Sequence, residues 1–140
     1  MDGYDFSAEI TVRFAETDAQ AVAHHASFVV WLEVARVAYL TEHAGGYGAI
    51  RAQGLEALTT EVHVRYHRPV LFDDRIRIWI RYVDFRGARF RCEYALEKLT
   101  EEAPELVAEA YTAHATVDAT TYRPTRVPAW FAEAVAKASA

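Results

Sequence analysis

An apolar segment at residues 26–43 constrains the fold of this chain more than any other feature. Apolar side chains fall on nearly every side of a helix drawn through it, which predicts a helix buried in protein or in lipid. Glu33, Arg36 and Glu42 argue against a membrane span, because ionised groups are costly in hydrocarbon. Glu33 and Arg36 are also spaced to pair on the helix surface, and Gly45–Gly46 would end the helix. We therefore expect the rest of the chain to cover the whole circumference of this helix.

Alternating apolar and polar residues predict strands on both sides of the helix. One run, from Glu9 to Phe14, precedes the helix and places Phe14 on its buried face. Four further runs lie at residues 60–66, 75–82, 89–96 and 106–117, and Pro128 opens a short amphipathic helix. Short turns between the later runs imply antiparallel pairing. The order predicts an α+β fold in which one antiparallel sheet of five strands wraps around one long central helix.

Length, charge and cysteine content limit the setting in which the chain works. The 140 residues fit a single domain, 1–140. A formal net charge of −5 gives no attraction to nucleic acid or to anionic membranes. Cys92 is the only cysteine and sits in a strand-like run, so we expect a buried side chain and no disulfide. No signal peptide is apparent at the N-terminus, which leads us to expect a reducing, cytoplasmic location.

The segment with chemical potential joins the first strand to the long helix. Asp18 lies in the approach to the helix, and His25 falls near its first turn. Backbone N–H groups at a helix start lack intrahelical partners and lie at the positive end of the helix dipole. Such amides can stabilise an oxyanion, and a nearby carboxylate can attack a thioester or activate water. An Asp before a helix is most often a turn or cap residue, so the residues alone leave both interpretations of Asp18 open.

Two motifs resemble the active-site signatures of hotdog-fold acyl-CoA thioesterases, in the 4-hydroxybenzoyl-CoA thioesterase branch. The first surrounds the helix start and matches that family at Thr17, Asp18, Ala19, Val22, His25, Ala26, Glu33 and Arg36. The second begins at Tyr66 and matches at Tyr66, Arg68 and Pro69, followed by Asp73 and Asp74. Both motifs occur at the expected separation, and the order of elements agrees along nearly the whole chain.

The resemblance implies an enzyme that hydrolyses a small or medium acyl-CoA to free acid and coenzyme A. It implies that Asp18 is the catalytic carboxylate, as nucleophile or general base, and that the backbone amide at His25 polarises the thioester carbonyl. It implies no cofactor, because coenzyme A is part of the substrate, and a homodimer that can pair again into a tetramer. Two alternatives stay open: a hydroxyacyl-thioester dehydratase using His25 with Asp18, and a non-catalytic protein that binds acyl-CoA or lipid.

Departures from the family pattern affect the substrate more than the reaction. Gln20 and Ala21 replace a glycine pair, so the acyl pocket is expected to be reshaped, and Gln20 adds an amide to the site. Candidates to line an acyl pocket are Phe28, Trp31 and Thr59.

Arginines concentrate on the middle strands. Exposed strand faces are normally charged, so a solvated outer face explains most of them. Arg86 and Arg89, which flank Gly87, are the preferred candidates to bind the phosphates of coenzyme A. No metal site is predicted, because no histidine has an acidic or cysteine partner at ligand spacing, and the adjacent side chains of His24 and His25 are expected to diverge.

Overall fold

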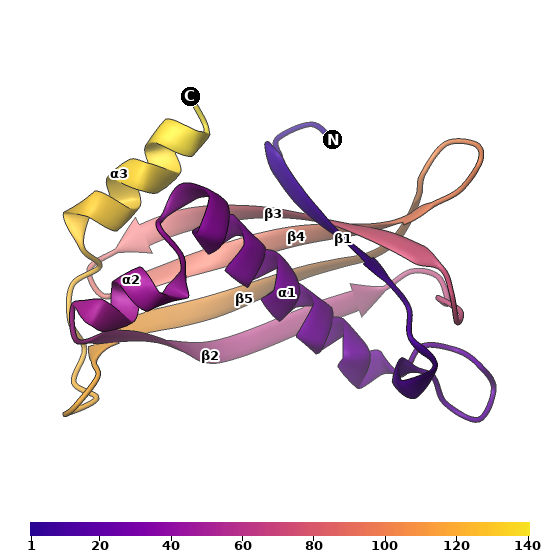
Figure 1. The fold of residues 1–140 in the computed structure, drawn as a ribbon, viewed down its shortest axis with the longest axis horizontal. Helices are drawn as coiled ribbons and strands as arrows, with labels where there is room; N and C mark the ends of the chain where they lie inside the picture. The colour runs from indigo at the N-terminus through magenta and orange to yellow at the C-terminus, as the bar shows by residue number, and fades with distance from the viewer.

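The apolar segment forms one long helix, α1 (His25–His43), which lies across one face of a five-stranded antiparallel sheet (Figure 1). The computed structural model describes residues 1–140. The other elements are a 3-10 turn (Phe14–Glu16), α2 (Tyr47–Ala52), α3 (Ala129–Ala138) and the strands β1 (Phe6–Thr11), β2 (Leu55–Tyr66), β3 (Arg75–Arg86), β4 (Arg89–Leu99) and β5 (Glu105–Asp118). The predicted α+β class, with five strands around one long helix and a short C-terminal helix, is confirmed.

The sheet has the strand order β1-β3-β4-β5-β2, so β1 and β2 are its two edges. Strand β3 pairs with β4, β4 pairs with β5, and the other side of β5 pairs with β2. Gly87 forms the tight turn between β3 and β4 with φ of 60°, a conformation that glycine adopts without strain. Alternate side chains of the strands point toward α1 and belong to the core.

The core lies between α1 and the concave face of the sheet. Trp31, Leu32 and Ala35 on the inner side of α1 are at most 1% exposed. They meet strand residues that are equally buried, among them Ile76, Ile78, Tyr94, Leu96 and Val107. Each large apolar side chain buried in this way contributes about 1.5–3 kcal/mol to the driving force for folding. Cys92 is also buried, as expected, and burial raises the pKa of its thiol to about 12.

The prediction that the first strand extends to Phe14 is wrong. Strand β1 ends at Thr11, and Phe14 starts the 3-10 turn with 73% of its surface exposed. The Phe14 ring packs edge-on against Phe72, with 5.8 Å between centroids. The chain turns at this point because the Glu16 carboxylate accepts a hydrogen bond from the Arg13 backbone N–H, at 2.8 Å.

The prediction that the chain covers the whole circumference of α1 is also wrong. Four valines on the outer side of α1, which we call the valine stripe, are between 39% and 51% exposed: Val29, Val30, Val34 and Val37. No other element of the chain covers this stripe, and β2 is one of the two edges of the sheet that no other strand covers. Glu33 and Arg36 form no ion pair, because Arg36 Nη1 donates instead to the Tyr94 hydroxyl at 3.0 Å.

Helix α1 ends where the glycines predicted, and a second helix follows that the sequence did not reveal. The Gly46 N–H donates to the Leu40 carbonyl at 2.8 Å, which closes the end of α1. Helix α2 then occupies part of the Gly-containing connection and buries Ile50. Helices α2 and α3 lie at the end of the molecule that α1 approaches with its C-terminus (Figure 1).

Candidate active site

Asp18 begins a tight loop that leads directly into α1. The loop closes on itself like a small hairpin, with a bridge between Thr17 and Ala23. The Asp18 N–H donates to the Val22 carbonyl at 2.8 Å, and the Ala21 N–H donates to the Asp18 carbonyl at 3.0 Å. The loop therefore holds Asp18 close to the start of the helix even though seven positions separate it from His25 in the sequence.

The Asp18 carboxylate uses one oxygen to hold the loop. Its Oδ1 accepts from the Gln20 N–H at 2.8 Å and from the Val22 N–H at 3.4 Å. Oδ2 has no partner within the chain, and both Asp18 and Gln20 lie at the surface. The geometry is that of an aspartate turn. One oxygen fixes the position of the carboxylate and the other is free to meet a ligand.

The start of α1 leaves one backbone amide unpaired. His24 is the N-cap residue, and its Nδ1 accepts from the Ala26 N–H at 3.1 Å. The Ser27 N–H donates to the His24 carbonyl, whereas the His25 N–H has no acceptor within the chain. The rings of His24 and His25 stack with 4.2 Å between centroids, so the expectation that these side chains diverge is wrong. A free N–H thus lies at the positive end of the helix dipole.

The second motif packs against the first. The Tyr66 hydroxyl donates to the His25 carbonyl at 2.8 Å, and the Ala23 N–H donates to the Val70 carbonyl at 2.6 Å. A groove of about 330 Å³ lies between the motifs, lined by residues that include His25, Tyr66 and Arg68. Phe28 lies at its base but is only 2% exposed, which makes it primarily a core residue. The structure therefore brings together two motifs that are far apart in the sequence.

Glu16 supports this region and was missed from the sequence. Its Oε2 accepts from the Trp31 indole N–H at 2.7 Å, in addition to the bond from Arg13 to Oε1. Its backbone carbonyl accepts from the His24 N–H at 2.7 Å. Burial alone would raise the pKa of Glu16, but the hydrogen bonds from Arg13 and Trp31 outweigh burial and lower the pKa. Trp31 is thus a structural partner of Glu16.

Replacing Glu16 by glutamine is expected to destabilise the protein by about 2 kcal/mol at pH 7, because the amide cannot accept from both donors. A carboxylate whose folded pKa is lowered stabilises fully above its unfolded pKa, about 4.3. That contribution is lost as the pH falls through the lower folded value. Urea unfolding at pH 7 and at pH 3 should therefore show a difference between wild type and variant that shrinks in acid. Glu101→Gln, at an exposed turn, should show no difference at either pH.

Ala21, which stands where the family pattern has glycine, adopts a left-handed backbone conformation with φ of 62°. A Cβ atom in this conformation costs about 1 kcal/mol. Ala21→Gly should therefore raise the unfolding free energy by about 0.5–1 kcal/mol, measured as a higher midpoint in urea. Ala23→Gly, in the same loop with an ordinary backbone conformation, should instead lower the midpoint. Equal effects from the two substitutions would contradict this assignment of strain.

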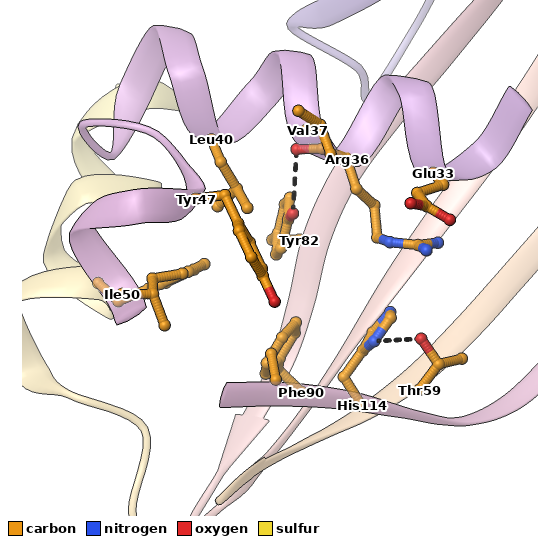
Figure 2. A pocket seen from close by; sticks show the side chains of 12 residues that line it. Glu33, Arg36, Val37, Leu40, Tyr47, Ile50, Thr59, Tyr82, Phe90 and His114 are labelled. Atoms are coloured by element: carbon orange, nitrogen blue, oxygen red, sulfur yellow. Dashed lines mark hydrogen bonds between the residues drawn. The ribbon is translucent and has the colours of Figure 1, made fainter. Parts of the chain in front are cut away.

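Thr59 lies away from this loop, in a chamber of about 440 Å³ beneath the C-terminal half of α1. Figure 2 shows polar side chains on one side of the chamber and apolar side chains on the other. Thr59 Oγ1 lies 3.3 Å from His114 Nδ1, and His114 Nε2 lies 2.7 Å from Thr112 Oγ1. Burial, and then the charge of Arg36, lower the pKa of His114 to about 4. The His114 ring is therefore neutral at pH 7, and it forms a hydrogen-bonding part of the chamber wall.

Arg86 and Arg89 lie at a third place, on the outer face of the sheet. Together with Arg91 they line a hollow of about 540 Å³ near the β3–β4 turn. Arg91 lies 3.8 Å from the Asp84 carboxylate and stacks over the Tyr111 ring. Arg86 and Arg89, in contrast, form no ion pair within the chain. Two unpaired guanidinium groups beside a hollow can bind phosphate.

The predicted residues thus divide among three places on one chain. His25 and Phe28 line the groove at the start of α1, and Thr59 lines the chamber. Asp18 and Gln20 lie exposed in the loop before α1 and do not line the groove, and Arg86 and Arg89 line the outer hollow. None of the helices has the length and apolar character that a membrane span requires. No group of three or more His, Cys, Asp or Glu side chains is placed to hold a metal ion. A carboxylate in the loop that leads to a free helix amide is a combination that acyl transfer can use.

Comparison with known proteins shows the family of the chain. The family model described as Thioesterase-like superfamily matches residues 12–135. The protein YneP of Bacillus subtilis (strain 168) is 29% identical over 118 residues, which cover 83% of this chain and 82% of YneP. Acyl-CoA thioester hydrolase YbgC of Escherichia coli O157:H7 is 30% identical over 106 residues, which cover 73% of this chain and 79% of YbgC.

Solved structures show the same fold. A hypothetical protein from Aquifex aeolicus superposes with a TM-score of 0.83 at 26% identity, over 93% of this chain and 98% of that one. A thioesterase from Thermus thermophilus, crystallised with coenzyme A and Zn, superposes with a TM-score of 0.81 at 20% identity, over 99% and 96%. The predicted hotdog fold is confirmed. The family model covers nearly the whole chain, and the chain therefore belongs to the Thioesterase-like superfamily.

Proposed function

We propose that this protein is an acyl-CoA thioesterase with Asp18 as its catalytic carboxylate. One observation carries the proposal. A short loop connects Asp18, whose carboxylate is fixed with Oδ2 free, to His25, whose backbone amide at the helix start is unpaired. YbgC, the relative described above, is named an acyl-CoA thioester hydrolase. An acyl-CoA substrate also agrees with a cytoplasmic location. We propose no resident cofactor, because coenzyme A enters and leaves with the substrate.

The chemistry follows from the two groups. The thioester carbonyl oxygen accepts a hydrogen bond from the His25 N–H, which stabilises the negative charge that develops there in the tetrahedral intermediate. Asp18 either attacks the carbonyl carbon or removes a proton from the attacking water. Collapse of the intermediate breaks the carbon–sulfur bond and releases the thiol. The balanced reaction is thioester plus water to carboxylic acid plus free coenzyme A.

The test of this function is release of free thiol from a panel of acyl-CoAs, with binding measured in parallel. Hydrolysis of any member supports the proposal, whereas binding without release would establish the non-catalytic alternative. Cys92 is buried and should react little with the thiol reagent. Crotonyl- or hydroxyacyl-CoA interconversion would reveal a dehydratase. The chain offers that reaction little support, since no carboxylate pairs with His25.

We propose that the enzyme acts as a homodimer joined along β2. This strand is a 12-residue edge with free backbone hydrogen-bonding groups, which is a ready template for another strand. Its residues Leu58 and Val62 are exposed, and the valines of the stripe on α1 are exposed as well. A second copy related by a two-fold axis would pair β2 with β2 and cover both stripes. A further pairing into tetramers is compatible with the same dimer.

Arg86 and Arg89 are proposed to bind the phosphates of coenzyme A. The double variant Arg86→Ala and Arg89→Ala should raise KM about tenfold with kcat changed less than about twofold, since charged hydrogen bonds to the nucleotide are lost. Acyl-pantetheine thioesters lack these phosphates and should show no difference between wild type and variant. Arg75→Ala provides a control, because Arg75 is already paired with Glu9 at 3.1 Å. An equal loss with acyl-pantetheine would contradict this assignment.

A further inference from the structure

Two consecutive peptide groups at the start of α1 contain the free amide on which the proposed function depends. In the first group, the His24 carbonyl accepts from the Ser27 N–H at 2.9 Å. In the second group, the His25 carbonyl accepts from the Tyr66 hydroxyl at 2.8 Å. The N–H of that second group belongs to Ala26 and donates to His24 Nδ1 at 3.1 Å. Of the four polar backbone atoms, the His25 N–H alone has no partner, and the atoms on both sides of it are held.

Tyr66 supplies the one bond of this set that comes from a distant part of the chain. It is the last residue of β2, where it pairs with Ala108 of β5. Its ring packs edge-on against the buried Phe28, with 4.9 Å between centroids. An edge-to-face contact of this kind fixes the orientation of the ring. The sheet and the core therefore set the position of the Tyr66 hydroxyl, which reaches the His25 carbonyl as a rigid arm.

The Tyr66 hydroxyl must be the donor in this bond, because a backbone carbonyl only accepts. Burial raises the pKa of Tyr66, so the hydroxyl keeps its proton at neutral and mildly alkaline pH. A phenylalanine at this position would keep the ring that contacts Phe28 and lose only the donor. The hydrogen bond can thus be removed without removing the packing.

The position of the His25 N–H matters because an oxyanion donor acts over a short distance. A donor must lie about 2.7–3.1 Å from the developing negative charge, and loss of one donor costs about 10²–10³-fold in kcat. A displacement of about 1 Å is enough to cost a large factor in rate. The N–H and the carbonyl of His25 flank the same Cα atom, so movement of the carbonyl also moves the amide.

We propose that Tyr66 is a positioning residue, whose hydroxyl holds the His25 carbonyl and so keeps the adjacent His25 N–H directed at the oxyanion of the tetrahedral intermediate. This inference rests on the proposed function. Tyr66 acts through the backbone of α1 and takes no part in breaking the thioester. The second motif thereby gains a role in catalysis, because β2 sets the geometry of a donor that belongs to the first motif.

The first experiment measures steady-state kinetics of Tyr66→Phe, with folding checked by urea unfolding. We expect kcat for acyl-CoA hydrolysis to fall about tenfold and KM to change less than about twofold, because the donor is misplaced rather than lost. Tyr122→Phe, which removes an exposed hydroxyl without a hydrogen-bond partner, should change neither constant. An unchanged kcat in folded Tyr66→Phe, beside an active wild type, would overturn the inference. A wild type that hydrolyses no acyl-CoA would instead refute the proposed function.

The second experiment measures binding by calorimetry and needs no turnover. Trifluoroacetonyl-coenzyme A is a ketone that hydrates readily, and its tetrahedral form presents an oxygen to the oxyanion donor, whereas free coenzyme A has no such oxygen. Tyr66→Phe should raise the Kd of the ketone about tenfold and leave the Kd of coenzyme A within about twofold. Equal weakening of both would show that Tyr66 contacts the coenzyme A portion directly, and this result would overturn the inference. Unchanged binding of the ketone would overturn it as well.

Discussion

Asp18→Asn is expected to lower kcat for acyl-CoA hydrolysis by about 10²–10⁴-fold, the usual contribution of a general base. The asparagine carbonyl can still accept the hydrogen bonds from Gln20 and Val22 that fix the loop. The substitution removes the negative charge and the basic oxygen without removing the turn. The unfolding free energy should therefore change by less than about 1 kcal/mol. Steady-state kinetics and urea unfolding measure the two quantities separately.

A matched control exists on the same chain. Asp118 forms the same kind of turn, with Oδ1 accepting from the Thr120 and Thr121 N–H groups at 2.9 Å. Its hydrogen bonds lower its pKa, so Asp118→Asn tests what loss of charge in such a turn does to stability alone. We expect no loss of turnover in this variant. Equal turnover in wild type and Asp18→Asn would show that Asp18 is only a turn residue.

Val30→Glu is expected to convert the proposed dimer to a monomer of 15.8 kDa and to lower turnover about 100-fold. Val30 is 51% exposed in the single chain, so a glutamate there leaves the monomer core intact. In a dimer the same side chain would place an unpaired charge in the apolar valine stripe. Tyr66 at the end of β2 holds the start of α1 through its bond to His25, so loss of the proposed β2 pairing should disturb the site and lower turnover. Analytical ultracentrifugation gives the mass and thiol release gives the rate.

The control for this experiment places the same charge on another helix. Ala136 is exposed on α3, away from β2, and Ala136→Glu should change neither mass nor turnover. If Val30→Glu stayed dimeric, the proposed interface would be wrong. If it became a folded monomer with full activity, the expected dependence of turnover on the dimer would be wrong.

Much of the fold was predictable because hydrophobic periodicity reports burial directly. The runs around Ile76, Ile78 and Ile80 alternate strictly, and all three side chains are buried in β3. The position of Asp18 before the helix was likewise evident from the loop and the helix start. The local pattern could not show which contacts a side chain makes with other residues in the folded chain. Phe14 continues the alternation of its strand, yet the capping of the Arg13 N–H by Glu16 turns the chain outward.

The valine stripe shows a second limit of the sequence. Val29 and Val34 are as apolar as the buried side of α1, so periodicity cannot separate a surface buried in the chain from one left for another chain. The chamber was missed for a related reason. Its walls come from α1, α2, several strands and α3, and only the folded chain brings Thr59 next to His114. Short helix α2 lies among glycines that are typical of a loop.

The position of α2 and α3 has an evolutionary consequence. They close one end of the chamber, while the loop that carries Asp18 lies beyond the opposite end of α1 (Figure 1). Mutations in these peripheral helices can reshape the chamber without disturbing the loop. Selection can therefore act on the two regions almost separately, which favours divergence of the chamber on one common frame.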